Sequence, residues 1–203
     1  MNFLGIGESC QTAYQIRRYF KTNERYIFDW VISSLDSVEI VLQKIKPEDI
    51  LQTDNLQVTD DGLRLLDKGT LIKHQHDFKL DENQKHVISS VEVDLEEVRK
   101  KYIYLLRKTK QFILDAHPVF VFYDWTKRPE NFEKIYSLQK LISEEFGYNT
   151  KFIYVTENDY YLNKSKKNES VCFFLIDNSR VKGTKFMWRG CDEEWNRVFD
   201  SLC

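Results

Sequence analysis

Four continuous apolar runs of strand length are spread along the chain, at residues 2–7, 119–124, 151–156 and 171–177. Continuous rather than alternating apolar character is typical of strands in a parallel sheet that is buried on both faces. Amphipathic segments lie between these runs, as expected for parallel strands that are joined through helices. The pattern therefore predicts an α/β architecture.

The helices are predicted by apolar residues that recur every three or four positions. Ser9 is expected to cap the first helix, and Pro129 and Gly147 are expected to begin and end the fourth. The predicted helices span approximately residues 10–20, 36–45, 94–112, 129–146 and 192–202.

The region between the first two apolar runs has a different pattern. Residues 26–32 resemble a strand that carries Asp29, and residues 56–66 have the form of a hairpin with Asp61-Gly62 at its turn. Residues 71–78 alternate between apolar and polar positions, which predicts a strand with His74 and His76 on one face. These features predict an excursion from the parallel sheet.

Length and composition agree with one compact unit. A chain of 203 residues with 42% hydrophobic content is long enough to bury a substantial core. We therefore expect a single α/β domain over residues 1–203, with a mixed, mostly parallel sheet, helices on both faces and a hairpin excursion near residues 56–66.

Charge and cysteine usage narrow the functional classes. The 30 Lys and Arg against 32 Asp and Glu give a net charge of -2, which argues against a general nucleic-acid binder. No apolar run approaches the ~18 residues that cross a bilayer, and the first residues lack a signal-peptide pattern. The four Cys form no CxxC pair, so we expect no metal, no cofactor and a cytoplasmic location.

The segment GIGESCQ contains the strongest chemical signal. Glycines end a strand, and Ser9, Cys10 and Gln11 then begin a helix. A helix N-terminus lowers the pKa of a thiol, and its free amides can bind an oxyanion. The alternative is that Cys10 is a small apolar residue at a helix start. The other cysteines have less context: Cys172 is expected in a buried strand and Cys191 in a loop.

A thiol nucleophile needs a base and a group that orients the base. His76 is the first candidate for the base, because it ends the alternating segment, and His74 is the second. Asp29 and Asp192 are candidates for the orienting acid. Asp77 is the weakest candidate, since neighbouring strand residues point to opposite faces.

Two further features have both a functional and a structural interpretation. Arg17, next to Arg18, could meet an anionic ligand, although a solvated arginine pair is the commoner case. The segment 188–195 contains Asp192 beside Gly190, and its structural interpretation is a loop followed by a helix that Asp192 caps.

The runs SCQTAYQIRR, YIFDWVISSLDSV and HDF, in this order, resemble the family of putative papain-like cysteine peptidases. The resemblance covers about the first 80 residues. It implies Cys10 as nucleophile, His76 as base and a role for Asp29. It also implies a papain-like α+β fold, in which the cysteine helix packs on an antiparallel sheet, whereas the apolar pattern predicts parallel strands.

The leading hypothesis is a cysteine-dependent hydrolase or acyl transferase acting on an amide, ester or thioester of an unidentified substrate, with a protein and a glycan-linked molecule as the candidates. A second hypothesis is a non-catalytic module whose aromatic side chains bind a glycan, nucleotide or protein partner. A third is glycan processing through Asp29 and Asp192 without the thiol. Neither nucleic acid nor a membrane is an expected partner.

Overall fold

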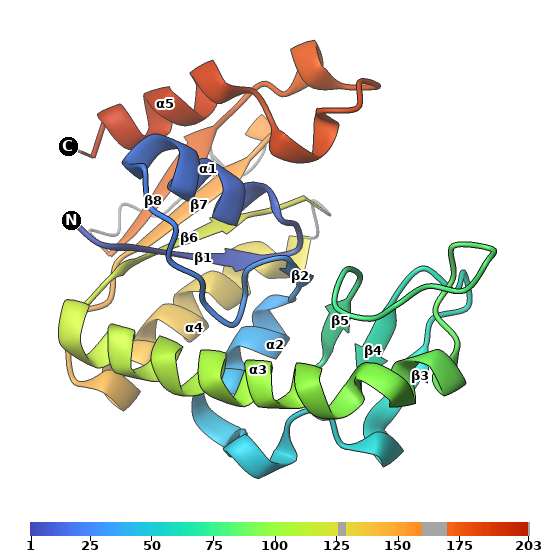
Figure 1. Cartoon of the computed structure of the whole chain (residues 1–203). Coiled ribbons are helices and arrows are strands. Elements are labelled where there is room, and N and C mark those ends of the chain that lie inside the picture. Colours follow the sequence, from blue (N-terminus) through green and yellow to red (C-terminus); the bar gives the residue numbers. More distant parts are fainter. Residues whose placement is uncertain (126–128, 160–169, 203) are drawn as a thin grey trace.

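The computed structural model describes residues 1–125, 129–159 and 170–202 of the chain. Its centre is a parallel sheet with the strand order β1-β6-β7-β8 (Figure 1). The strands are β1 (Phe3–Gly7), β6 (Val119–Tyr123), β7 (Phe152–Thr156) and β8 (Val171–Leu175). Each coincides with one of the four apolar runs, so the prediction of a parallel α/β core is confirmed.

Helices cover both faces of this sheet (Figure 1). One face carries α1 (Gln11–Phe20) and α5 (Asp192–Asp200), which bury a cluster of mainly aromatic and branched side chains against the sheet. The other face carries α2 (Leu35–Glu39), α3 (Ile88–Ala116) and α4 (Pro129–Phe146). Because helices cover both faces of the sheet, every residue of β1, β6 and β7 is buried, and nearly all of these residues are apolar or glycine.

A second sheet lies beside the first and is antiparallel, with the order β2-β5-β4-β3 (Figure 1). Its strands are short: β2 (Val31–Ile32), β3 (Leu56–Val58), β4 (Leu65–Asp67) and β5 (Ile72–His74). β3 and β4 form the predicted hairpin, with Gly62 at a φ of 72° in its connection. The antiparallel strands thus form a separate sheet.

The long helix α3 joins the two sheets. One continuous cluster of buried side chains includes Leu105 and Leu106 of α3, Phe120 of the parallel sheet, and Leu65 and Ile72 of the antiparallel sheet. The helix begins at Ile88, six residues before the predicted start, because Val91 in its first turn is already buried in this core. Its N-terminus is therefore set by tertiary packing.

Two local predictions were wrong in extent. Residues 26–30 form loop and turn, and β2 begins only at Val31. The strand predicted over residues 71–78 ends at His74 and is followed by a bend. The helix predicted over residues 36–45 is present as α2 and a π-helical turn over Ile40–Lys44, and Ser34 caps it by accepting a hydrogen bond from the Ser37 N–H.

Two further expectations need correction. Cys172 is exposed, because β8 is the edge strand of the parallel sheet. The arrangement implied by the family resemblance, a cysteine helix on an antiparallel sheet, is also not observed, since α1 packs on β1 and β6 of the parallel sheet. Among the described residues, no helix combines the length and apolarity needed to cross a membrane.

The role of α3 can be tested by comparing two leucines of the same helix. Leu106 is 1% exposed and Leu114 is 49% exposed. Leu106→Ala should lower the free energy of unfolding by about 2–5 kcal/mol, because it leaves a cavity between the helix and the sheets. Leu114→Ala should cost less than about 1 kcal/mol. Urea denaturation measures both, and equal losses would contradict the packing described for α3.

Candidate active site

The candidate nucleophile lies where β1 passes into α1. Gly7 has a φ of 125°, and a Cβ atom at this position would lie 2.9 Å from the Phe122 ring, so only glycine fits. Cys10 is the N-cap residue of α1, and its carbonyl accepts a hydrogen bond from the Tyr14 N–H at 3.0 Å. The Ser9 hydroxyl accepts one from the Gln11 N–H at 3.3 Å. Ser9 and Cys10 therefore both take part in the helix start.

The environment of Cys10 differs from the expectation of a lowered thiol pKa. Burial is the main cause that raises the pKa of Cys10 to about 11, and the negative charges of Asp29 and Asp77 contribute to this rise. These effects outweigh the helix N-terminus, which was expected to stabilise the thiolate. At neutral pH the thiol is therefore protonated, and attack on a substrate requires a base.

Gln11 is fully buried beside the cysteine. Its Oε1 accepts hydrogen bonds from Trp195 Nε1 at 3.0 Å and Asn178 Nδ2 at 3.2 Å. These two donors fix the orientation of the amide, and its Nε2 is buried without a partner in the described part of the chain. Gly190 packs directly against this side chain, since a Cβ there would approach it to 2.5 Å. Gln11, the residue after Cys10 in the sequence, thus has an unused N–H donor.

The second part of the site is a histidine–carboxylate pair. His74 ends β5 and is almost completely buried, and its Nδ1 lies 3.1 Å from Asp77 Oδ2. The bend after His74 turns the chain back, so Asp77 faces the ring although a continuous strand would point it elsewhere. Asp77 was ranked as the weakest orienting acid because the predicted strand extended to residue 78, whereas the observed strand ends at His74. In His–carboxylate pairs of this kind the acid fixes the ring orientation and leaves Nε2 for chemistry.

Asp77 is held by α3 as well. Its Oδ2 accepts a hydrogen bond from the Tyr102 hydroxyl at 2.7 Å, and its Oδ1 lies 2.6 Å from Lys101 Nζ. Burial by itself opposes ionisation of Asp77, but contacts with His74, Lys101 and Tyr102 hold its pKa well below the usual range. The Tyr102 ring also meets the His74 ring edge-on, with centroids 4.7 Å apart. One helix thus positions both members of the pair.

His76 has a different environment. It lies in the bend after β5 and is exposed. A third histidine, His86, is buried near this group, and its burial lowers its pKa. The structure therefore places Asp77 against His74, and His76 toward solvent.

A short backbone path connects the thiol segment to the histidine. The N–H and the hydroxyl of Ser33 both donate to the Gly7 carbonyl, each at 3.0 Å. Ser33 directly follows β2, in which Val31 pairs with His74 of β5. The segment that leads into Cys10 and the strand that carries His74 are therefore joined through β2.

The two remaining acids each pair with a different arginine of α1. Asp29 is buried and forms an ion pair with Arg17, and its burial raises its pKa despite this partner. Asp192 lies 3.1 Å from Arg18, and its Oδ1 accepts a hydrogen bond from Gln15 at 2.9 Å. Asp192 is the first residue of α5 rather than its cap, which is Cys191. Asp29 and Asp192 thus have different ion-pair partners.

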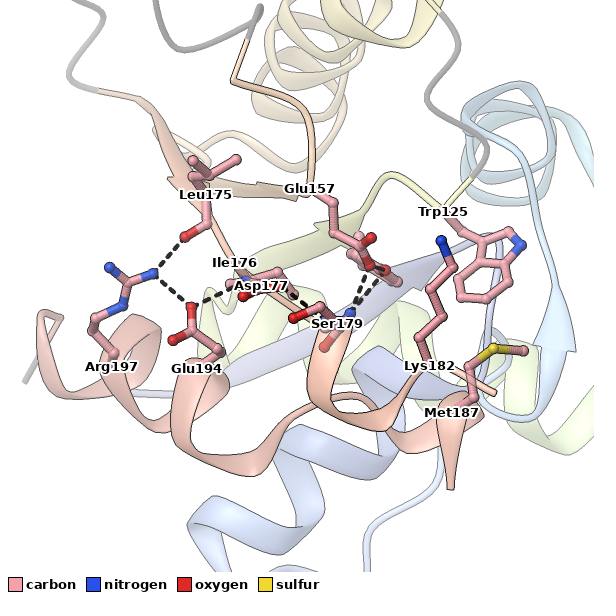
Figure 2. Close-up of a pocket in the computed structure, with 12 residues that line it drawn as sticks. Trp125, Glu157, Leu175, Ile176, Asp177, Ser179, Lys182, Met187, Glu194 and Arg197 are labelled. Atoms are coloured by element: carbon pink, nitrogen blue, oxygen red, sulfur yellow. Dashed lines mark hydrogen bonds and ion pairs between the residues drawn. The ribbon is translucent and has the colours of Figure 1, made fainter. Parts of the chain in front are cut away.

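A cavity of ≈ 720 Å³ opens at the carboxyl ends of β6, β7 and β8 (Figure 2). Trp125, Lys182 and Met187 form one side, and the ion-paired Glu194 and Arg197 form the other. Carboxyl ends of parallel strands are the usual binding edge of open α/β sheets. The wall of this cavity includes Tyr123, Glu157 and Asn178, and the Asn178 amide connects it to Gln11.

Comparison with known protein families decides the family of this chain. Residues 1–158, which include the thiol and the histidine–carboxylate pair, match the family described as putative papain-like cysteine peptidase (DUF1796). The chain belongs to this family. The resemblance based on the Ser-Cys-Gln, Phe-Asp-Trp and His-Asp-Phe blocks is thereby confirmed. No curated protein and no solved structure matches the chain.

Within this family member, sequence reasoning missed the contributions of α3. Tyr102 and Lys101 are indistinguishable from ordinary residues of an amphipathic helix, and no local pattern relates them to Asp77. The His-Asp-Phe block did contain the acid. The spacing of His74 and Asp77, three residues apart, is the one signal that could have found the pair.

The raised pKa of Cys10 leads to a test by alkylation with iodoacetamide. Only the thiolate reacts, so the rate at Cys10 should rise about tenfold per pH unit from pH 7 to pH 10 without reaching a plateau. The exposed Cys172 would obscure this signal, so the chain should carry Cys172→Ser. Mass spectrometry follows the modified peptide, and Cys10→Ser gives the background. A plateau below pH 8 would show a thiolate already formed at neutral pH.

Proposed function

We propose that the protein is a cysteine-dependent hydrolase or acyl transferase, in which Cys10 attacks an amide, ester or thioester carbonyl. The family's description supports a hydrolase-type reaction. The observation that carries the proposal is the buried His74–Asp77 pair, joined through β2 to the segment that ends in Cys10. A nucleophile, a base and an acid that orients the base are the parts that such catalysis needs.

In the proposed reaction, His74 Nε2 takes the Cys10 proton as Sγ bonds to the carbonyl carbon. The bond to the leaving group breaks, the leaving group receives the proton from His74, and a thioester remains on Cys10. Water, or another nucleophile in a transferase, then cleaves the thioester and regenerates the thiol. The amides at the start of α1 and Gln11 Nε2 would donate to the oxyanion.

His74 is proposed as the base because it has the partner that a base requires. Asp77 can hold its ring and stabilise the positive charge that forms when the proton is taken. His76, the first candidate from the sequence, is exposed in a bend and remains the alternative base. The raised thiol pKa fits general-base activation during attack better than a thiolate formed in advance.

A cytoplasmic location is part of this proposal, since it would keep the nucleophile reduced. Cys10, Cys172 and Cys191 are free, which supports a reducing compartment. The ≈ 720 Å³ cavity favours a second candidate function, a binding module that recognises a small ligand at the strand ends without acyl chemistry. The reactivity of Cys10 distinguishes the two.

The proposal can be tested with p-nitrophenyl acetate as acyl donor on the Cys172→Ser chain. We expect a burst of p-nitrophenolate and an acetyl group on Cys10, found by peptide mapping, and neither in Cys10→Ala. His74→Ala should slow acylation at least ~100-fold, the usual contribution of a positioned base. His76→Ala should leave the rate within about twofold.

The histidine variants also separate the alternatives. A large loss in His76→Ala with little change in His74→Ala would assign the base to His76. Acylation of Cys10 at equal rates in both variants would contradict general-base catalysis, and no acylation in the parent chain would favour the binding module. Circular dichroism and urea denaturation should accompany His74→Ala, because its side chain is buried.

A further inference from the structure

Four aromatic side chains from distant parts of the sequence gather beside α1. We call Tyr14, Trp30, Phe186 and Trp188 the aromatic cluster. The Trp188 ring lies 5.3 Å from Tyr14 and 5.9 Å from Trp30, measured between centroids. Phe186 is 45% exposed and Trp188 is 39% exposed. Large aromatic side chains grouped at a surface in this way commonly mark a binding site.

The guanidinium of Arg189 lies among these rings. Its Cζ is 4.9 Å from the Trp188 centroid and 5.1 Å from the centroids of both Tyr14 and Phe186. Stacking on three rings fixes the plane of the guanidinium and reduces its contact with water. Arg189 is therefore held in place before any ligand binds.

Arg189 differs from the other arginine that contacts the aromatic cluster. Arg17 lies over Trp30 and also has a carboxylate partner, Asp29. Arg189 has no acidic partner among the described residues, and its Nε is buried without a hydrogen bond there. A fixed, partly desolvated guanidinium without a carboxylate is arranged to receive one from a ligand.

This guanidinium belongs to a segment that packs on the first turns of α1. The Arg189 carbonyl accepts a hydrogen bond from Gln15 Nε2 at 2.6 Å, and Gly190 touches Gln11. Tyr14 follows Cys10 by four residues, one turn along the same helix. Tyr14 of the aromatic cluster therefore lies one helical turn from the proposed nucleophile.

The charges around Arg189 indicate what kind of anion would fit. A hollow of ≈ 440 Å³ includes Arg189, Arg180, Asp192 and Glu193 in its wall. Asp192 is paired with Arg18, and Glu193 accepts a hydrogen bond from the Cys191 thiol at 3.1 Å. The nearby carboxylates would repel a doubly charged group, so a singly charged carboxylate fits better than a phosphate.

We propose that Arg189 and the aromatic cluster form a subsite that binds a carboxylate carried next to an aromatic or large apolar group, such as the last residue of a peptide. The guanidinium would bind the carboxylate through two hydrogen bonds, and Phe186 and Trp188 would contact the apolar group. Because the subsite would select substrates for Cys10, this inference rests on the proposed function.

The test compares two probes that differ in one charge, N-acetyl-phenylalanine and N-acetyl-phenylalaninamide. Binding to the Cys10→Ser chain is measured by calorimetry, so that no turnover interferes. We expect the carboxylate to bind at least ~10-fold more tightly than the amide. Arg189→Gln should remove this preference while leaving the weak binding of the amide unchanged.

Matched variants make the outcome specific. Arg107→Gln removes the same charge from the exposed face of α3 and should leave the preference intact. Arg189→Lys keeps the charge but not the planar pair of donors, and it should retain only part of the preference. Equal affinity of the two probes for the parent chain, or an undiminished preference in Arg189→Gln, would overturn the proposal.

Two further results separate this subsite from the catalytic proposal. Tighter binding of phenyl phosphate than of N-acetyl-phenylalanine would overturn the assignment to a carboxylate. A chain that binds the carboxylate through Arg189 but is never acylated at Cys10 would contradict the proposed reaction and leave the subsite standing. Acylation of Cys10 in a chain that shows no preference for the carboxylate probe would contradict the subsite and leave the proposed reaction standing.

Discussion

The buried carboxylate of Asp77 is the contact on which the arrangement of the site depends. It accepts from Tyr102 and Lys101 of α3 and lies against His74 of the antiparallel sheet. Since α3 also packs under the parallel sheet, this one side chain connects the histidine to the framework that carries Cys10. A buried anion with several partners is stable only while all of them stay in place, so the contact also restricts the relative position of helix and strand.

Burial opposes ionisation in both halves of the site, but the outcome differs between Cys10 and Asp77. It raises the pKa of Cys10 and leaves the thiol neutral at rest, whereas the partners of Asp77 overcome burial and keep that acid ionised. The resulting negative charge lies close enough to oppose formation of a thiolate. A free thiol that stays protonated is less exposed to oxidation and to unwanted acylation. In the proposed mechanism, the thiol becomes reactive only when the carbonyl carbon of a bound substrate is in place to accept the electron pair of Cys10 Sγ.

The sequence predicted what local patterns determine. The four continuous apolar runs, the start of α4 at Pro129 and its end before Gly147 all follow from burial and backbone preference within short windows. The antiparallel sheet was harder, because strands of two or three residues are too short to show a period. The bend after His74 brings Asp77 against the histidine, although the sequence ranked Asp77 last among the candidate acids. The pKa of Cys10 depends in part on Asp29 and Asp77, which lie 19 and 67 positions away in the sequence. Such effects come from tertiary contacts and leave no local pattern.

The hydrogen bonds to Gln11 connect the part of the chain that matches the family with the part that follows it. Cys10, His74 and Asp77 all lie within residues 1–158, the part that matches the family. The donors that fix Gln11, Asn178 and Trp195, lie beyond that part, as does Arg189. The proposed nucleophile, base and acid therefore lie in the part that matches the family, whereas Arg189 and two of the four rings of the aromatic cluster, Phe186 and Trp188, lie beyond it. Exchange of the C-terminal stretch between family members would be a route to new specificity with the same nucleophile.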